Sequence, residues 1–248
     1  MPVYRVDPNP HRVTYGTTLG VLVMKSRVPC IPGSVSNAST YRYPVLYRVV
    51  EGLDVRRLVY EADESLIEPI LREARELERQ GVSAITADCG YMALFQRQVA
   101  SQLRVPVCLS SLLQVPLIRV MLPDSRKIGV VVADSRSVRP HMLEAVGIRA
   151  DASVVIAGME ERPAFWSAVM DENGELDSDA VERELLEVVH CLLRKHPDIS
   201  ALLLECSELP AYSAAVQQAV RLPVFDFMTL LDYVHASLAQ QPYRGTYL

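Results

Sequence analysis

The sequence predicts an α/β fold of two pseudo-symmetric α/β/α lobes, each with a four-stranded, mostly parallel sheet, and an active site in the cleft between them. Two observations lead to this fold class. Short apolar segments, typical of strands buried on both faces of a parallel sheet, alternate with segments of helical periodicity. In addition, two blocks of the first half recur in the second half in the same order, which indicates a duplicated unit.

The apolar segments are short and rich in β-branched residues, and we expect strands at 18–24, 45–50, 83–88, 105–109, 127–132, 153–157, 200–205 and 222–226. Apolar residues at helical spacing predict helices at 63–80, 112–121, 136–146, 178–195 and 227–238. Either Asp63, or Ser65 with Glu68 at capping-box spacing, begins the first helix, and Gly81 ends it. We expect the last helix to pack against the first lobe.

The repeat sets the expected domain organisation. Residues 83–107 align with 200–224 at an offset of 117 with seven identities in 25 positions, where about one or two are expected by chance at average composition. Residues 19–27 align with 128–136 at an offset of 109. Reuse of strand–helix units in α/β proteins would also give weak similarity, but two blocks in matching order favour duplication. The predicted lobes are 1–122 plus 224–248, which includes the C-terminal helix, and 123–223.

Composition narrows the classes of partner. The chain has 248 residues, a formal net charge of −5 and five cysteines. The mild acidity argues against nucleic acid as a partner, and no apolar run reaches the roughly 18 residues of a membrane span. The N-terminus lacks a signal-peptide pattern, and an odd number of cysteines in a chain of this length is typical of reduced thiols. We therefore expect a cytoplasmic protein without a membrane partner, and homo-oligomerisation is left open.

Two of the cysteines occupy equivalent positions of the repeat. Cys89 and Cys206 each end a predicted buried strand, where the chain leaves the sheet and begins a helix. Ligands of open parallel sheets bind at this edge, and a helix N-terminus favours the thiolate. Asp88 and Glu205 precede the two cysteines and would oppose ionisation if they lay close, although strand alternation is expected to turn them to the other face. The remaining cysteines, Cys30, Cys108 and Cys191, are expected to pack.

A pseudo-twofold axis would place the two thiols on opposite sides of one cleft. This geometry suits removal of a proton from one face of a carbon and return of a proton to the other face, which inverts a stereocentre. The sequence therefore predicts inversion of a small carboxylate-bearing chiral acid by a racemase or epimerase. A lone thiol at a strand end would more simply pack, and a non-catalytic two-lobed binding protein is the alternative from another class.

These residues carry a family resemblance. The chain resembles the cofactor-independent aspartate/glutamate racemase superfamily, which also contains hydantoin racemases, arylmalonate decarboxylases and maleate isomerases. The most specific match is the segment Leu204-Glu205-Cys206-Ser207-Glu208-Leu209-Pro210, which looks like the superfamily's second-cysteine motif. The first-cysteine segment departs from the pattern, because Gly90 and Tyr91 follow Cys89 where amino-acid racemases usually have Asn-Thr. This departure argues against free aspartate or glutamate as the substrate.

The resemblance implies a PLP-independent racemase or isomerase of an amino acid or a hydantoin-like compound, with Cys89 and Cys206 as the catalytic pair and with no cofactor. It also implies a set of substrate-binding candidates: Ser207, Gly90, Ser110, Ser111, Thr18, Glu208 and Arg27. For some of these a structural role is equally plausible. The two adjacent serines could cap the next helix, Glu208 could be a solvated helix-start residue, and Arg136 stands in lobe two where Arg27 stands in lobe one. Decarboxylation and cis–trans isomerisation are the alternative reactions within the superfamily.

Other site types find no support in the sequence. There is no phosphate-binding glycine motif, and the scattered histidines do not suggest a metal site. A small-molecule carboxylate is therefore the expected partner. The polar segment 28–44, rich in Pro, Ser and Gly, interrupts the symmetry of the repeat. It is either a functional loop near the cleft or a disordered flap.

Overall fold

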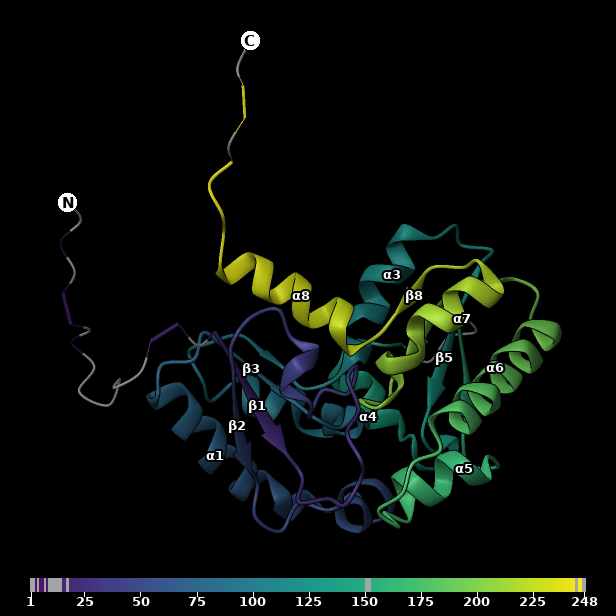
Figure 1. The fold of residues 1–248 in the computed structure, drawn as a ribbon, viewed down its shortest axis with the longest axis horizontal. Coiled ribbons are helices and arrows are strands. Elements are labelled where there is room, and N and C mark those ends of the chain that lie inside the picture. Colours follow the sequence, from purple (N-terminus) through teal and green to yellow (C-terminus); the bar gives the residue numbers. More distant parts are fainter. Residues whose placement is uncertain are drawn as a thin grey trace.

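A computed structural model describes residues 3, 5, 6, 8, 15, 16, 18–149, 153–243, 245 and 246, which form two lobes side by side (Figure 1). Each lobe contains a four-stranded parallel sheet, and the strand orders are β2-β1-β3-β4 and β6-β5-β7-β8. The two orders are equivalent when the second lobe is laid on the first. The predicted fold class is therefore confirmed.

The strands lie within a few residues of the predicted segments. The first sheet contains β1 (Leu19–Val23), β2 (Val45–Val49), β3 (Ala84–Ala87) and β4 (Val107–Cys108). The second sheet contains β5 (Lys127–Val132), β6 (Val154–Gly158), β7 (Ile199–Leu204) and β8 (Val224–Phe225). The central strand β1 is buried along its whole length, as its continuous apolar sequence predicts.

Helices flank both sheets. The α-helices are α1 (Ile67–Arg79), α2 (Gln96–Ala100), α3 (Val115–Met121), α4 (Pro140–Ala145), α5 (Pro163–Phe165), α6 (Ser178–Lys195), α7 (Ser213–Val220) and α8 (Phe227–Leu238). Shorter 3₁₀ and π turns are η1 (Ala38–Thr40), η2 (Arg56–Tyr60), η3 (Glu64–Leu66), η4 (Gly90–Phe95), η5 (Ser111–Gln114), η6 (Ser135–Ser137), η7 (Trp166–Met170) and η8 (Leu209–Tyr212). The helix expected at 136–146 is thus divided between η6 and α4, which begins at a proline.

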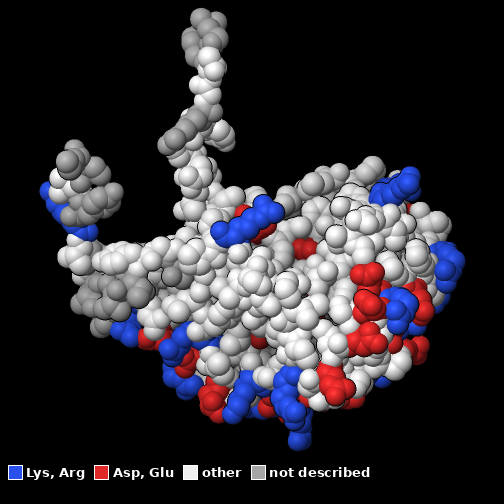
Figure 2. Space-filling model, in the orientation of Figure 1, with Lys and Arg blue, Asp and Glu red and all other residues white. Residues whose placement is uncertain are grey.

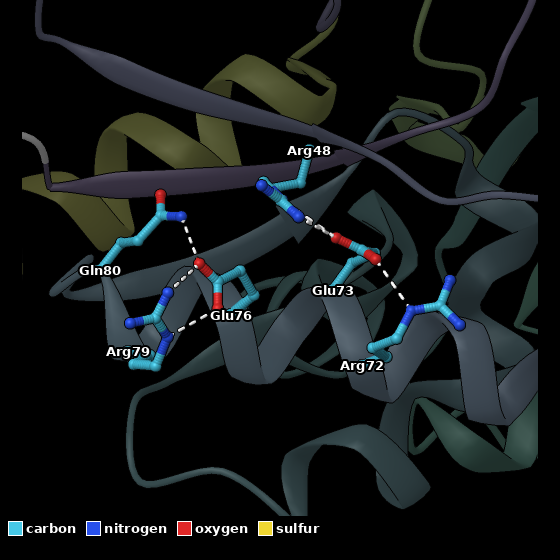
Figure 3. A network of polar contacts seen from close by, with 6 residues as sticks. All are labelled: Arg48, Arg72, Glu73, Glu76, Arg79 and Gln80. Atoms are coloured by element: carbon cyan, nitrogen blue, oxygen red, sulfur yellow. Dashed lines mark hydrogen bonds and ion pairs between the residues drawn. The ribbon is translucent and has the colours of Figure 1, made fainter. Parts of the chain in front are cut away.

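Polar contacts cap the turn that leads into α1 and hold the helix against the first sheet. The Asp63 carboxylate accepts the backbone N–H of Ser65 at 2.9 Å and begins the turn that leads into α1, so Asp63 is the cap at this end. Farther along the helix, the Glu73 carboxylate accepts hydrogen bonds from Arg48 of β2, at 2.5 and 3.0 Å, and from its neighbour Arg72 (Figure 3). The Arg48–Glu73 ion pair therefore joins α1 to the edge strand of the first sheet.

The duplication extends to unusual backbone features. Each lobe has a π turn after its second strand, at η2 and η7. Shortly after these turns, Ala62 and Glu172 have positive φ angles of 49° and 51°, a conformation that is uncommon outside glycine. These paired features lie 110 residues apart, close to the predicted offset of 109. They support the duplicated architecture that the sequence alignment predicts.

The end of the chain connects the two lobes. β8 pairs with β7, so the predicted boundary at 223/224 is wrong, because it assigns a strand of the second sheet to the first lobe. The chain then crosses back, and α8 lies over the first sheet (Figure 1), where Phe227 and Leu231 are buried with Leu19 and Val21 of β1. The expected packing of the last helix against the first lobe is confirmed.

Side chains of both signs share the visible surface. Figure 2 shows Lys and Arg interspersed with Asp and Glu along the lower and right-hand edges of one face, and a mostly uncharged middle. Within the described part of the chain, no helix combines the length and apolarity needed to cross a bilayer. One cluster of buried apolar side chains extends through both lobes, so the lobes share a continuous core.

Candidate active site

The two sequence-predicted cysteines line one cavity between the lobes. Cys89 follows β3 and directly precedes η4, and Cys206 follows β7 and precedes η8, so each thiol lies at the carboxyl end of a central strand. The cavity has a volume of about 530 Å³, part of it open to solvent. The Ser207 hydroxyl donates a hydrogen bond to the Asp88 carbonyl, which links the two cysteine-bearing segments directly.

Both thiols are protonated in the free protein. Burial raises the pKa of the Cys89 thiol well above its ordinary value, and the carboxyls of Glu205 and Asp88 raise it further. Burial and the Glu208 carboxyl likewise raise the pKa of Cys206. Backbone N–H groups oppose these effects: that of Tyr91 lowers the pKa of Cys89, and those of Glu208 and Leu209 lower the pKa of Cys206. At both cysteines this opposing contribution is outweighed by burial and by the nearby carboxyls.

The carboxyls of two buried residues and one half-buried residue line the cavity close to the thiols. Asp88 accepts hydrogen bonds from the Met24 backbone N–H and from the Ser36 hydroxyl, each at 3.1 Å. Glu208 accepts one from the Ser34 hydroxyl at 3.0 Å, and Glu205 has no hydrogen-bond partner at either oxygen. Burial raises the pKa of Asp88 and of Glu208 to about 7 and that of Glu205 to about 8.

Asp88 and Glu205 therefore do not point away from the site. The alternation of side chains along a strand predicts the opposite face for the residue before each cysteine, but both carboxyls line the same cavity as the thiols. The reason is that β3 ends at Ala87 and β7 at Leu204, so strand alternation no longer applies at these positions. Their effect on the cysteines is the one expected for close carboxyls, because both raise the pKa of the Cys89 thiol.

The segment 28–44, which we call the strap, is ordered and packs on both lobes. Ser34 and the Val35 backbone N–H bond to Glu208 and to the Ser207 carbonyl of lobe two, at 3.0 and 3.2 Å. Ser36 bonds to Asp88 of lobe one. The strap also contributes Val28, Cys30 and Ser36 to the cavity lining. Of the two alternatives for this segment, the structure thus supports a loop that belongs to the site.

The other predicted site residues divide into two groups. Gly90, Ser207 and Glu208 line the cavity together with the two cysteines. Ser110 and Ser111 do not: the Ser110 hydroxyl accepts the Leu112 N–H and caps η5, and the Ser111 hydroxyl donates to backbone carbonyls of the second lobe, including that of Glu205. Both serines are fully buried. The capping alternative therefore describes Ser110, and Ser111 joins the two lobes.

Thr18 and Arg27 also lie outside the cavity lining. Thr18 stands at the amino end of β1, where its carbonyl accepts the Ser83 N–H, and this edge of the sheet is opposite to the one that holds the thiols. Arg27 is exposed, although its neighbours Ser26 and Val28 line the cavity, and it lies close to Gly174 of the second lobe. Arg136, its counterpart, forms an ion pair with Asp134 at 2.7 Å.

Sequence reasoning did not identify several lining residues. Cys30 reaches the cavity through the strap, and burial together with the Glu208 carboxyl raises its pKa to about 11. An isolated cysteine in an irregular loop does not indicate a site in the sequence. Tyr91 was noticed only as a departure from the superfamily pattern. In the structure its hydroxyl donates to the Asp134 carbonyl at 2.6 Å and accepts the Asp134 N–H at 2.9 Å, which fixes η4 against lobe two.

The charged residues among the described ones that line the cavity are all acidic. Four of its residues are acidic, Asp88, Glu172, Glu205 and Glu208, and among the described residues that form it there is no Lys, Arg or His. In the described ranges, no group of three or more His, Cys, Asp and Glu side chains is arranged to hold a metal ion. A site of this kind complements a ligand that carries positive charge, and its thiols supply a base once one of them is ionised.

Comparison with known proteins gives the family. Dimethylsulfoniopropionate lyase 7 of Emiliania huxleyi (strain CCMP1516) is 31% identical over 238 residues, which cover 92% of this chain and 69% of that protein. The chain belongs to the dimethylsulfoniopropionate lyase family. Lyase 3 of the same organism is 34% identical over 92% of this chain, and the lyase of Durusdinium sp. clade D is 29% identical over 96%. The chain spans about three fifths of the length of lyase 3, at 61%, and 79% of the Durusdinium protein.

Solved structures show the same fold at low sequence identity. Allantoin racemase from Klebsiella pneumoniae has a TM-score of 0.63 at 10% identity, with 93% of this chain and 97% of that chain covered. Picrophilus torridus aspartate racemase has a TM-score of 0.56 at 14% identity, with 92% and 96% covered. Unliganded arylmalonate decarboxylase has a TM-score of 0.55 at 15% identity, with 93% and 97% covered. The expected resemblance to the aspartate/glutamate racemase superfamily is confirmed at the level of the fold. No established family profile matches the chain.

The expected reaction is wrong. The curated relatives that share 29–34% identity over most of the chain are lyases, not racemases. Two opposed thiols suggested inversion at a carbon, but removal of the proton next to a carboxylate is a step that racemases share with eliminating enzymes. The lyase class entered the sequence analysis only as an alternative, through the decarboxylases, and the relatives favour that class.

Proposed function

We propose that this protein is a lyase that eliminates dimethyl sulfide from dimethylsulfoniopropionate. The observation that carries the proposal is a cavity that combines two thiols with acidic side chains and has no basic one among its described lining residues. The substrate named by the relatives has a sulfonium cation at one end and a carboxylate at the other. An acidic cavity complements the cation, whereas it would disfavour a purely anionic substrate.

The elimination needs one base. A thiolate removes a proton from the carbon next to the substrate carboxylate, and the electron pair of that C–H bond forms the double bond. The C–S bond breaks on the next carbon, and its electron pair leaves with the sulfur. The products are dimethyl sulfide, acrylate and one proton, so atoms and charge balance. The departing sulfide is neutral and needs no protonation, so no second acid–base group is required for it.

We assign the base to Cys206. The backbone N–H groups of Glu208 and Leu209 both lower the pKa of Cys206, whereas only that of Tyr91 lowers the pKa of Cys89. Hydrogen bonds to the charged form favour ionisation, so the Cys206 thiolate is the better stabilised of the two. The pKa of either free thiol is raised by burial and by nearby carboxyls, and a bound sulfonium offsets the carboxyl charge. Substrate binding thus favours formation of the thiolate that removes the substrate proton.

The test measures product release. Purified protein is incubated with dimethylsulfoniopropionate near pH 8, with dimethyl sulfide measured in the headspace and acrylate by NMR, against a protein-free control for base-catalysed decomposition. We expect release in stoichiometric amounts from the wild type and a loss of at least about a hundredfold in Cys206→Ser, because general-base catalysis contributes about 10²–10⁴-fold. The absence of dimethyl sulfide above the control would refute the proposed function.

Two single-cysteine variants test which thiol is the base. Cys89→Ser and Cys206→Ser remove one thiol each from the same cavity. If Cys206 is the base, Cys206→Ser abolishes dimethyl sulfide release, whereas Cys89→Ser retains measurable release. The reverse result would transfer the role of base to Cys89 and leave the lyase activity itself unaffected.

A further inference from the structure

The Glu205 carboxyl is the unexplained group of the cavity. The residue is fully buried, and neither carboxyl oxygen has a hydrogen-bond partner. Burying a carboxyl without partners is costly, and native structures retain such groups where they have a function. The mechanism proposed above does not use it. Glu205 lines the cavity, so a ligand can supply the partner that the protein does not.

Gly90 makes room for this carboxyl. A Cβ atom at position 90 would lie 2.0 Å from the Glu205 Oε1 atom, well inside van der Waals contact. Gly90 is also one of the two positions that depart from the superfamily pattern after the first cysteine. The departure that argued against an aspartate or glutamate substrate is thus the one that admits the Glu205 carboxyl. The two residues come from different lobes and act as a matched pair.

The carboxyls of Asp88 and Glu208 already have partners. Asp88 accepts from Met24 and Ser36, and Glu208 accepts from Ser34. Of these three carboxyls, that of Glu205 is therefore the one whose buried oxygens have no hydrogen-bond partner in the described part of the chain. The same cavity is lined by apolar side chains, among them Val59, Val169 and Met170. A cation that carries methyl groups in place of N–H donors fits such a lining, because it needs charge compensation and apolar contact but no hydrogen-bond acceptors.

We propose that the Glu205–Gly90 pair is the recognition site for the cationic end of the ligand, so that the cavity selects carboxylates bearing a methylated onium group. This inference rests on the proposed function and identifies Glu205 as the residue that binds the sulfonium group. Glu205 is a specificity-determining residue here and does not act as the base. Quaternary ammonium carboxylates of the same shape belong to the same ligand class.

Binding of the cation has a proton signature. Burial keeps Glu205 protonated below about pH 8 in the free protein, and a cation beside it favours the ionised form. Ligand binding at pH 7 therefore releases up to one proton from Glu205. Glu205 raises the pKa values of Cys89, Tyr91 and Cys206 further, and Asp88 and Glu208, with pKa values of about 7, line the same cavity. A Glu205→Gln variant cannot release the Glu205 proton, whereas these five neighbours remain.

The test uses a pair of probes that differ only in charge. 3-(Trimethylammonio)propionate and its neutral-ended isostere 4,4-dimethylpentanoate have the same shape, and their affinities are measured by titration calorimetry in two buffers of different ionisation enthalpy. We expect the wild type to prefer the cation, and Glu205→Gln to reduce that preference about tenfold, or 1.4 kcal/mol, and to reduce the number of protons released. Glu187→Gln, which removes an exposed carboxyl paired with Arg162 outside the cavity, is the matched control and keeps both.

A second variant separates misfolding from recognition. Gly90→Ala introduces a Cβ that displaces the Glu205 carboxyl and would lie 2.8 Å from the Glu205 carbonyl oxygen, so it lowers the preference for the cation in the wild-type background. In Glu205→Ala only the backbone contact remains, and the preference should change little further. A cation preference that survives both Glu205→Gln and Gly90→Ala, in a protein that releases dimethyl sulfide, would overturn the assignment of Glu205 alone. Absence of dimethyl sulfide release by the wild type would instead refute the proposed function, and the two failures are therefore distinguishable.

Discussion

Gly33 holds the strap against the second lobe, and its substitution by alanine tests whether the strap organises the site. Its φ angle is +109°, a conformation that residues with a Cβ rarely adopt. An added Cβ would lie 2.3 Å from the Ala211 Cα atom in η8, the turn that follows Cys206. Because the clash is with backbone, neither segment can relieve it by a rotamer change. The strap must therefore move away from the lobe.

The magnitude follows from the contacts that the displaced strap loses. Three hydrogen bonds connect it to the cysteine-bearing segments: Ser34 to Glu208, the Val35 N–H to Ser207, and Ser36 to Asp88. Each contributes about 0.5–1.5 kcal/mol, and the left-handed conformation costs a further 1–2 kcal/mol or so for a residue with a side chain. We expect Gly33→Ala to lower the free energy of unfolding by about 3–5 kcal/mol.

The assay combines urea unfolding with the rate of dimethyl sulfide release. Activity should fall more steeply than stability predicts, because the displaced strap releases the carboxyls that surround the thiols. Gly147→Ala is the matched control: Gly147 also has a positive φ, +81°, but a Cβ there would lie at an ordinary 3.5 Å from Pro116. If Gly33→Ala were no less stable and no less active than Gly147→Ala, the strap would not have the organising role inferred here.

Three further predictions concern buried polar groups. Glu73→Ala removes the acceptor of Arg48 and should lower the free energy of unfolding by about 1–3 kcal/mol in urea at pH 7. Burial opposes ionisation of Glu73, but the neighbouring arginines hold its folded pKa below the ordinary value. The difference in stability between variant and wild type should therefore shrink as the pH falls through that pKa. Tyr91→Phe loses both hydrogen bonds to Asp134 between the lobes and should lower the thermal midpoint, with unchanged stability as the contrary result. Burial raises the pKa of Glu205 to about 8, so the folded state retains a proton that the unfolded state loses, and stability from this group declines as the pH rises from about 4.5 to 8. Glu205→Gln should flatten that decline in unfolding experiments at several pH values, and an unchanged slope would contradict it.

Local sequence was sufficient to predict the elements and their order. The eight strands and the long helices follow from apolar periodicity, and the repeat at an offset of 117 places Cys89 and Cys206 at equivalent strand ends. Ligands of parallel sheets bind at the carboxyl ends of strands, and a pseudo-twofold relation between duplicated lobes places these two ends on opposite sides of one cleft, so the shared cavity of the two thiols follows from the same pattern. The departure at Gly90 was also visible in the sequence, although its meaning was not.

The remaining features depend on contacts through space. The lining by Cys30 and Ser36 arises because the strap crosses both lobes, and no periodicity in a polar loop specifies where it packs. Strand alternation failed at Asp88 and Glu205 because both follow the last paired residue of their strands. The type of reaction was also beyond the cysteine pattern, since removal of a proton next to a carboxylate serves racemases and lyases alike.

By itself, the sequence determined the two-lobed α/β fold and the paired cysteines, because burial in parallel strands and duplication leave a direct record in residue order. Only the tertiary structure decided the electrostatic character of the site. The ionisation of a carboxyl depends on its solvation and on the partners around it, and these are assembled from β3, β7, the strap and η4 together. Glu205 and Gly90 illustrate this point. The two residues are 115 positions apart in the sequence, and only the folded structure brings them into contact.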